Sequence, residues 1–149
     1  MYNRHVIVDL ADLTEALARL AMEGSDCLEI EAKTFAEYSH RALGPTLSAF
    51  ANLPGGGTIL LGVSEDPVSI VGVQDPHDLQ QALISQARQG FSTEIAVDTH
   101  AITVEGKTVV AANVQEAPVN SKPCRWKETG AAYLRQYDGD YRMSQQEEQ

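Results

Sequence analysis

The chain has 149 residues, of which 43% are hydrophobic and 21% charged, a composition typical of one globular domain and not of a disordered or collagen-like chain. No run approaches the roughly 20 apolar residues of a membrane helix, and the N-terminus lacks the basic start and apolar stretch of a signal peptide, so we expect a cytoplasmic protein with no membrane partner. The formal net charge of −10 repels nucleic acid and anionic membranes on average.

The charge is distributed unevenly along the sequence. Residues 1–31 hold two basic and seven acidic side chains, whereas residues 122–142 hold five basic and three acidic ones. One end of the domain is therefore able to meet an anion that the other end repels.

The first elements are a helix and a strand. Residues 12–22 place apolar side chains at helical spacing, and Asp12 is the expected N-cap, with Glu15 three positions later. Residues 28–33 alternate apolar and charged side chains, which is typical of a half-buried strand.

A second helix, a glycine-rich turn and a buried strand follow. Helical spacing returns over residues 38–53, and because proline suits a first helical turn better than an interior, the regular helix is expected to begin near Gly44, just before Pro45. Residues 55–57 are all glycine. The apolar run 58–63 then predicts a central strand that is buried on both faces.

The second half of the chain predicts a helix between strand pairs. The expected elements are a hairpin partner at 68–73, a helix opening at Pro76 and ending at Gly90, strands at 94–104 and 107–115 around a Glu105-Gly106 turn, and a short strand at 133–135. The polar tail from Ser144 has nothing to bury, so we expect it to fray or to continue into another domain. The order indicates a single α+β domain, residues 1–149, with helices packed on one mixed β-sheet.

The three glycines at 55–57 admit two interpretations. Consecutive glycine N–H groups can hold a phosphate, but a Walker loop lies between a strand and a helix and carries a lysine. Here the order is helix, glycines, strand, and no lysine follows. The pattern therefore favours a structural turn and assigns no cofactor-binding residue.

Acidic side chains gather at two strand ends. Asp26, Glu29 and Glu31 accompany the first strand, and Glu65 with Asp66 follows the buried strand. Converging carboxylates are suitable ligands for Mg²⁺ or Mn²⁺ in phosphoryl transfer. The alternative is a solvated strand face in an acidic protein, and the residues alone favour this alternative.

Near the C-terminus, cationic side chains are interleaved with aromatic ones. We call these six residues the basic aromatic strip: Lys122, Arg125, Trp126, Lys127, Tyr133 and Arg135. Such a surface can contact phosphates and stack bases. An edge strand with a half-buried tryptophan explains the same residues equally well.

Four sequence motifs together resemble one known family. They are Ile30-Glu-Ala-Lys33, Thr46-Leu-Ser-Ala-Phe-Ala-Asn52, the Gly55–Val63 segment, and Ala132-Tyr-Leu-Arg135 followed by Asp138-Gly-Asp140. Over about residues 20–145 the chain resembles the Schlafen AlbA type 2 domain, formerly labelled a divergent AAA domain. The resemblance implies a Schlafen/Alba-like fold with its core at about residues 20–143.

The family suggests a regulatory role. Its bacterial members are described as predicted transcriptional regulators or ATP-binding proteins and typically precede a winged-helix region. The resemblance therefore implies a nucleic-acid-binding regulatory domain, the N-terminal part of a longer regulator, and we expect weak DNA or RNA binding through the basic aromatic strip. No cofactor is required for this role.

The family also implies two alternatives. Animal Schlafen relatives cut RNA with three carboxylates, whose matching positions here are Asp26, where Glu is usual, Glu31, and Glu65 or Asp66; this implies a metal-dependent endoribonuclease using Mg²⁺ or Mn²⁺. The other alternative is a dimerisation or protein-interaction module, described as ATP-binding although the phosphate-cradling residues are missing. Alba-like sheets often pair, so by analogy we expect a homodimer.

Overall fold

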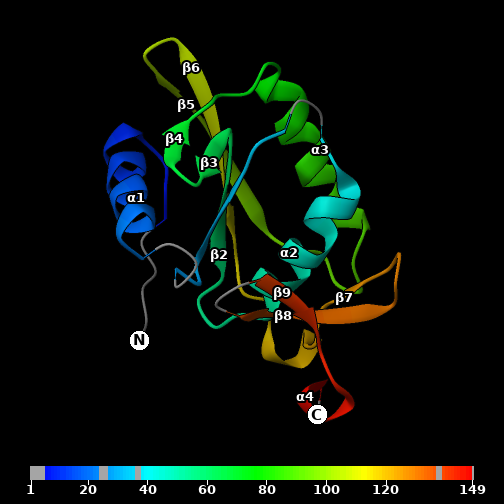
Figure 1. Ribbon diagram of the computed structural model, residues 1–149. Coiled ribbons are helices and arrows are strands. Elements are labelled where there is room, and N and C mark those ends of the chain that lie inside the picture. The colour runs from blue at the N-terminus through cyan, green and yellow to red at the C-terminus, as the bar shows by residue number, and fades with distance from the viewer. Residues whose placement is uncertain (1–5, 24–26, 36–37, 137–138, 149) are drawn as a thin grey trace.

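The computed structural model describes residues 6–23, 27–35, 38–136 and 139–148 (Figure 1). Its helices are α1 (Leu10–Glu23), α2 (His40–Asn52), α3 (Pro76–Gln89) and α4 (Gln145–Glu148), with a 3₁₀ turn at Val119–Ser121. Its strands are β1 (Ile30–Lys33), β2 (Gly57–Leu61), β3 (Val63–Glu65), β4 (Val68–Ile70), β5 (Val97–Val104), β6 (Lys107–Val114), β7 (Arg125–Trp126), β8 (Ala131–Gln136) and β9 (Gly139–Arg142).

The central sheet is mixed, as the sequence predicted. Its four strands lie in the order β1-β2-β6-β5, with β1 parallel to β2 and the other two pairs antiparallel. A parallel pair needs a long crossover, and α2 supplies it between β1 and β2. Two smaller sheets, β3-β4 and β7-β8-β9, accompany the central one. The α+β class is confirmed, although the domain contains more than one sheet.

Helices cover both faces of the central sheet (Figure 1). On one face, Ile59 and Leu61 of β2 pack with α2 and α3, while on the other face Leu60 packs with α1. Every residue of β2 is buried, which confirms the prediction of a strand buried on both faces. No helix in the described ranges is long and apolar enough to cross a membrane.

The start of α2 differs from the expected one. The helix begins at His40 rather than near Gly44, and Pro45 lies inside it. Ser39 caps the helix by accepting a hydrogen bond from the Ala42 N–H at 3.2 Å. The indole of Trp126 packs on the first turns so closely that a Cβ at Gly44 would lie 2.2 Å from a ring carbon. This cap and this packing extend the helix on the N-terminal side of its proline.

The N-cap of α1 lies three residues before the expected one. The Asp9 side chain accepts a hydrogen bond from the Asp12 N–H at 2.9 Å, so Asp9 and not Asp12 acts as the N-cap. Asp12 instead accepts a hydrogen bond from the Val8 N–H at 3.0 Å. The two aspartates have the spacing of a capping box, which explains why the sequence pattern was displaced by three residues.

The end of the described chain is more ordered than expected. The polar tail forms α4, in which Ser144 caps Glu147 and Glu148 pairs with Arg125 of β7. The short strand predicted at 133–135 is confirmed as part of β8, and β7 and β9 complete a sheet that the sequence did not predict. This three-stranded sheet lies against α2 (Figure 1).

Candidate functional site

Arg135 lies at the centre of a buried ion cluster that joins β8, β1 and β9. Its side chain is 6% exposed, and its Nη1 lies 2.6 Å from Glu31 Oε1 and 3.0 Å from Asp140 Oδ1. Thr46 of α2 donates its hydroxyl hydrogen to Asp140 Oδ2 at 2.8 Å. Burial disfavours the guanidinium charge, but Glu31 and Asp140 outweigh burial and hold the pKa of Arg135 above its ordinary value.

The same guanidinium also contacts backbone and an aromatic ring. Arg135 Nε donates to the Leu28 carbonyl at 2.9 Å and Nη2 donates to the Ile30 carbonyl at 3.3 Å. Its central carbon lies 5.0 Å from the centre of the Phe50 ring, a cation–π distance. Three of the four sequence motifs therefore meet at one inward-pointing side chain.

Glu65 lies close enough to this cluster to be influenced by it. Although the residue is exposed, partial desolvation and then the negative charge of Glu31 raise the pKa of its carboxyl. A hydrogen bond from the Ala32 backbone N–H and the charge of Arg135 oppose this shift. Glu31 and Glu65 lie in one corner of the molecule, where β1 packs beside β3.

These carboxylates do not by themselves complete a metal centre. Within the described residues, no three His, Cys, Asp or Glu side chains form a group that could hold a metal ion. Asp26 lies outside the described residues, and Asp66 is exposed. Glu31 is already paired with a guanidinium, whose positive charge competes with a cation. No catalytic step is derived from this corner, and its metal-binding role stays a prediction.

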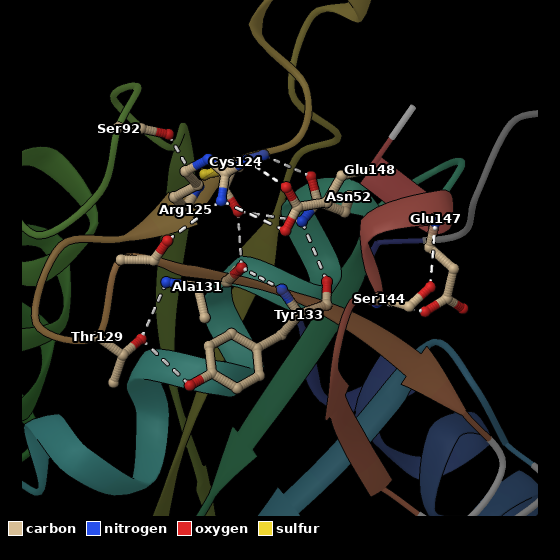
Figure 2. Close-up of polar contacts among 12 residues, drawn as sticks. Asn52, Ser92, Cys124, Arg125, Thr129, Ala131, Tyr133, Ser144, Glu147 and Glu148 are labelled. Atoms are coloured by element: carbon tan, nitrogen blue, oxygen red, sulfur yellow. Dashed lines mark hydrogen bonds and ion pairs between the residues drawn. The ribbon is translucent and has the colours of Figure 1, made fainter.

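Asn52 fastens the small C-terminal sheet to α2 (Figure 2). Its Nδ2 donates to the carbonyls of Cys124 and Tyr133, both at 3.1 Å, and its Oδ1 accepts from the Cys124 N–H at 2.7 Å. Ser48, one turn earlier, donates to the Cys124 carbonyl at 2.8 Å and accepts from the Tyr133 N–H at 3.1 Å. The sequence motif that ends at Asn52 predicts no role for this residue. The signal that pointed to one is a polar side chain at the end of an otherwise apolar helix.

The structure separates the members of the basic aromatic strip. Lys122 pairs with Glu116, and Arg125 pairs with Glu148 while also donating to the Gly130 carbonyl at 3.2 Å. Arg135 is buried in the ion cluster. Of the three remaining members, Lys127 is exposed, Tyr133 is half-buried and Trp126 is 7% exposed. The strip is therefore not one continuous cationic surface, and its contacts with nucleic acid stay a prediction.

Two strip members do line a common groove. A cavity of about 290 Å³ lies between the start of α2, the end of α3 and β7, and it is lined by His40, Ser85, Gln86, Gln89, Gly90, Trp126, Lys127 and Glu128. We call it the α2–α3 groove. Gln86 at its floor is fixed, because its amide donates to the His40 carbonyl at 2.9 Å and its carbonyl accepts from the Tyr38 hydroxyl. Arg41, with an 89% exposed side chain, lies 3.9 Å from Glu128 at the rim.

A larger cavity of about 630 Å³ lies at the other end of α3. It is bounded by the residues after β1, the β4–α3 connection and the β5–β6 turn, and Lys107 is its charged lining residue. Gly72 and Gly106 at its edge have φ of +84° and +80°. None of the residues predicted for a site lines this cavity.

Close backbone packing requires glycine at two positions of the glycine-rich turn. A Cβ at Gly56 would lie 2.1 Å from the Val114 carbonyl oxygen, and a Cβ at Gly57 would lie 2.3 Å from the Phe50 ring. The N–H of Gly55 donates to Glu116 Oε1 at 3.0 Å. The anion at this turn is therefore the protein's own carboxylate.

Comparisons with known proteins give a family and a fold. The family model described as Schlafen, AlbA_2 matches residues 26–144. No curated protein matches the chain. Among solved structures, the chain is similar to the N-terminal domain of a RecG-related protein from Nitrosomonas europaea, whose name places it provisionally among ATP-dependent DNA helicases. The identity is 31%, covering 88% of this chain and 87% of that one, with a TM-score of 0.69.

A second solved structure shares only the fold. The DIP2311 protein from Corynebacterium diphtheriae is 19% identical over 90% of this chain, with a TM-score of 0.60. This chain spans 26% of that one.

Proposed function

The chain belongs to the Schlafen, AlbA_2 family, and from that premise we propose that it is a nucleic-acid-binding domain that works within a larger regulatory protein. The observation that carries the proposal is the 31% identity with the N-terminal domain of a protein whose printed name relates it provisionally to the ATP-dependent DNA helicase RecG.

The α2–α3 groove is the surface we propose for phosphate contact. The exposed Lys127 supplies positive charge, and the first turn of α2 adds the partial positive charge of a helix N-terminus. Arg41 at the rim is offset by Glu128, which lies 3.9 Å from it and lines the groove. His40 and the edge of the buried Trp126 line the same groove and give it an aromatic wall. A flexible single strand fits such a site better than a rigid duplex does.

The distribution of acidic residues supports this location. The acidic helix α1 lies on the opposite face of the central sheet from α2 (Figure 1). Its negative charge therefore repels a polyanion mainly from the far side of the molecule. Because the whole chain still carries a net charge of −10, we expect binding to be weak and to decrease steeply with salt.

Fluorescence anisotropy with labelled single-stranded DNA and RNA at low salt tests the proposal. We expect Lys127→Ala to weaken binding several-fold, because one phosphate contact is lost. Lys107→Ala is the matched control, since it removes an exposed lysine that lines the other cavity. Absence of binding at low salt, or equal weakening by both variants, would contradict the proposal.

A metal-dependent endoribonuclease remains a second candidate. The observation that favours it is that β1, which carries Glu31, packs beside β3, which carries Glu65. Incubation of the chain with transfer RNA and Mn²⁺ tests it, using Glu65→Gln because this exposed residue does not hold the buried ion pair. Cleavage that Glu65→Gln abolishes supports the candidate, whereas no cleavage, or cleavage that persists unchanged in the variant, rejects this assignment.

A further inference from the structure

Strand β5 is an open edge of the central sheet. It is eight residues long and pairs with β6 alone. Its sequence, Val-Asp-Thr-His-Ala-Ile-Thr-Val, contains no proline, lysine or arginine, which are the residues that natural edge strands commonly use to prevent pairing with another chain. This edge therefore lacks the usual protection.

The pairing register shows which backbone groups face outward. Val104 and Lys107 lie directly opposite across the two-residue turn, so this pair exchanges hydrogen bonds, and the exchange recurs at every second residue. The bond from the Gln115 N–H to the Ala96 carbonyl, at 2.9 Å, continues the same alternation. The outward N–H and C=O groups consequently belong to Val97, Thr99, Ala101 and Thr103.

These outward groups have no protein partner in the described part of the chain. Among the described residues, none forms a hydrogen bond to the outward backbone N–H or C=O groups of β5. Ala101 and Thr103 have small, exposed side chains, so no bulky group blocks the approach of another strand. Helices α3 and α1 pack on opposite faces of β5 at Thr99 and Ile102, and neither lies along its outer edge.

We propose that β5 pairs antiparallel with β5 of a second copy of this chain, so that two central sheets join into one continuous sheet. The strand is complementary to itself. Asp98 and His100 lie on the same face, and His100 Nε2 is 2.8 Å from Asp98 Oδ2. A two-fold axis at Thr99 places each Asp98 opposite the partner's His100, so the intrachain pair is exchanged for two equivalent pairs across the interface, while Asn113 Nδ2 still donates to Asp98 Oδ2 at 3.0 Å.

The net charge of the chain gives this contact a distinctive salt response. Two chains of −10 repel each other at long range, whereas the paired strands have only Asp98 and His100 as ionisable groups. Added salt screens the repulsion and leaves the backbone hydrogen bonds. Self-association through β5 therefore strengthens as salt rises, the opposite of nucleic-acid binding.

Sedimentation velocity over a concentration series, at low and at high salt, tests the proposal. We expect a species of twice the 16.2 kDa chain mass that is favoured by concentration and by salt. Ala101→Pro removes an outward N–H from each strand but no bond to β6, and we expect it to weaken the dimer by about tenfold or more. Ala101→Ser keeps the N–H and is the matched control, with association unchanged.

Hydrogen exchange on the unaltered chain gives an independent measurement. The amides of Val97, Thr99 and Ala101, which pair across an axis at Thr99, exchange more slowly as concentration rises if β5 pairs with itself. A monomer at all concentrations, a dimer that Ala101→Pro leaves intact, or protection confined to other segments overturns the proposal. Each result is obtained without nucleic acid, so the proposed function is tested separately.

Discussion

At the scale of residues, one guanidinium connects three segments that are distant in the sequence. Arg135 reaches Glu31 and the backbone of β1, Asp140 of β9, and the Phe50 ring of α2. Two carboxylates and one guanidinium are removed from water there, so each depends on the others for its solvation. Residues of three family motifs therefore contact one another through Arg135 and hold the domain together.

Removal of this guanidinium is expected to be costly. Arg135→Ala leaves Glu31 and Asp140 buried without their cation, and we expect a loss of about 3–5 kcal/mol in the free energy of unfolding, measured by urea denaturation. Arg142→Ala, on the exposed side of β9, is the control, with a change within about 0.5 kcal/mol. Equal effects of the two substitutions would show that the ion cluster does not stabilise the fold.

Glu65 is expected to make the folded protein less stable as the pH rises from acid to neutral. Its pKa is raised in the folded protein, so folding favours the protonated carboxyl, and this contribution disappears as the pH rises through the folded pKa. We therefore expect Glu65→Gln to be more stable than the parent at neutral pH, and the difference to vanish in acid below the ordinary glutamate pKa of about 4.3. Thermal unfolding measured across this pH range checks the prediction, with Asp66→Asn as the control. A stability difference between Glu65→Gln and the parent that widens in acid contradicts it.

The sequence singled out Glu31 and Arg135 as candidate site residues but did not predict that they contact each other. Glu31 was interpreted as a metal ligand or a solvated charge, because a carboxylate on a half-buried strand suits both; its actual partner is 104 positions away. Arg135 was placed on an outward surface because cations usually face water. Such pairings depend on tertiary contacts that no local pattern carries.

At the scale of elements, the sequence was sufficient to predict those helices and turns whose ends are set by neighbouring residues in the chain. The helix α3 follows its Pro76 start and Gly90 end, and the β5–β6 hairpin follows its Glu105-Gly106 turn. Strand β7 has two residues, too few to display a period, and the four residues of β9 include one aromatic and no aliphatic side chain, so neither strand could be predicted. The start of α2 was displaced because its first turns are stabilised by a distant tryptophan.

Gly44 tests this dependence of α2 on Trp126. Alanine in place of glycine favours a helix by about 1 kcal/mol, but the new methyl group would lie 2.2–2.5 Å from three indole carbons. Overpacking of this kind costs about 1–3 kcal/mol, so we expect Gly44→Ala to lower the free energy of unfolding and to change the tryptophan fluorescence. Arg41→Ala, on the exposed side of the same helix, is the control. A stabilised Gly44→Ala would mean that the indole moves away freely.

At the scale of the whole molecule, charge and sheet edges define separate surfaces. The α2–α3 groove carries Lys127 and Arg41 on one side of the central sheet, and the acidic α1 covers the other side. The β5 edge lies between the helical layers and presents backbone rather than charge. A polyanion and a second copy of the chain are therefore able to bind together without competing for the same residues.

The salt dependence of nucleic-acid binding tests the central claim most directly. The logarithm of the binding constant should fall linearly with the logarithm of salt concentration, and Lys127→Ala should make that slope shallower by about 0.7–0.9, the value for one phosphate contact. Lys107→Ala should leave the slope of the parent chain unchanged. A binding constant that does not respond to salt, or a slope that Lys127→Ala leaves unaltered, would contradict a phosphate contact at the α2–α3 groove.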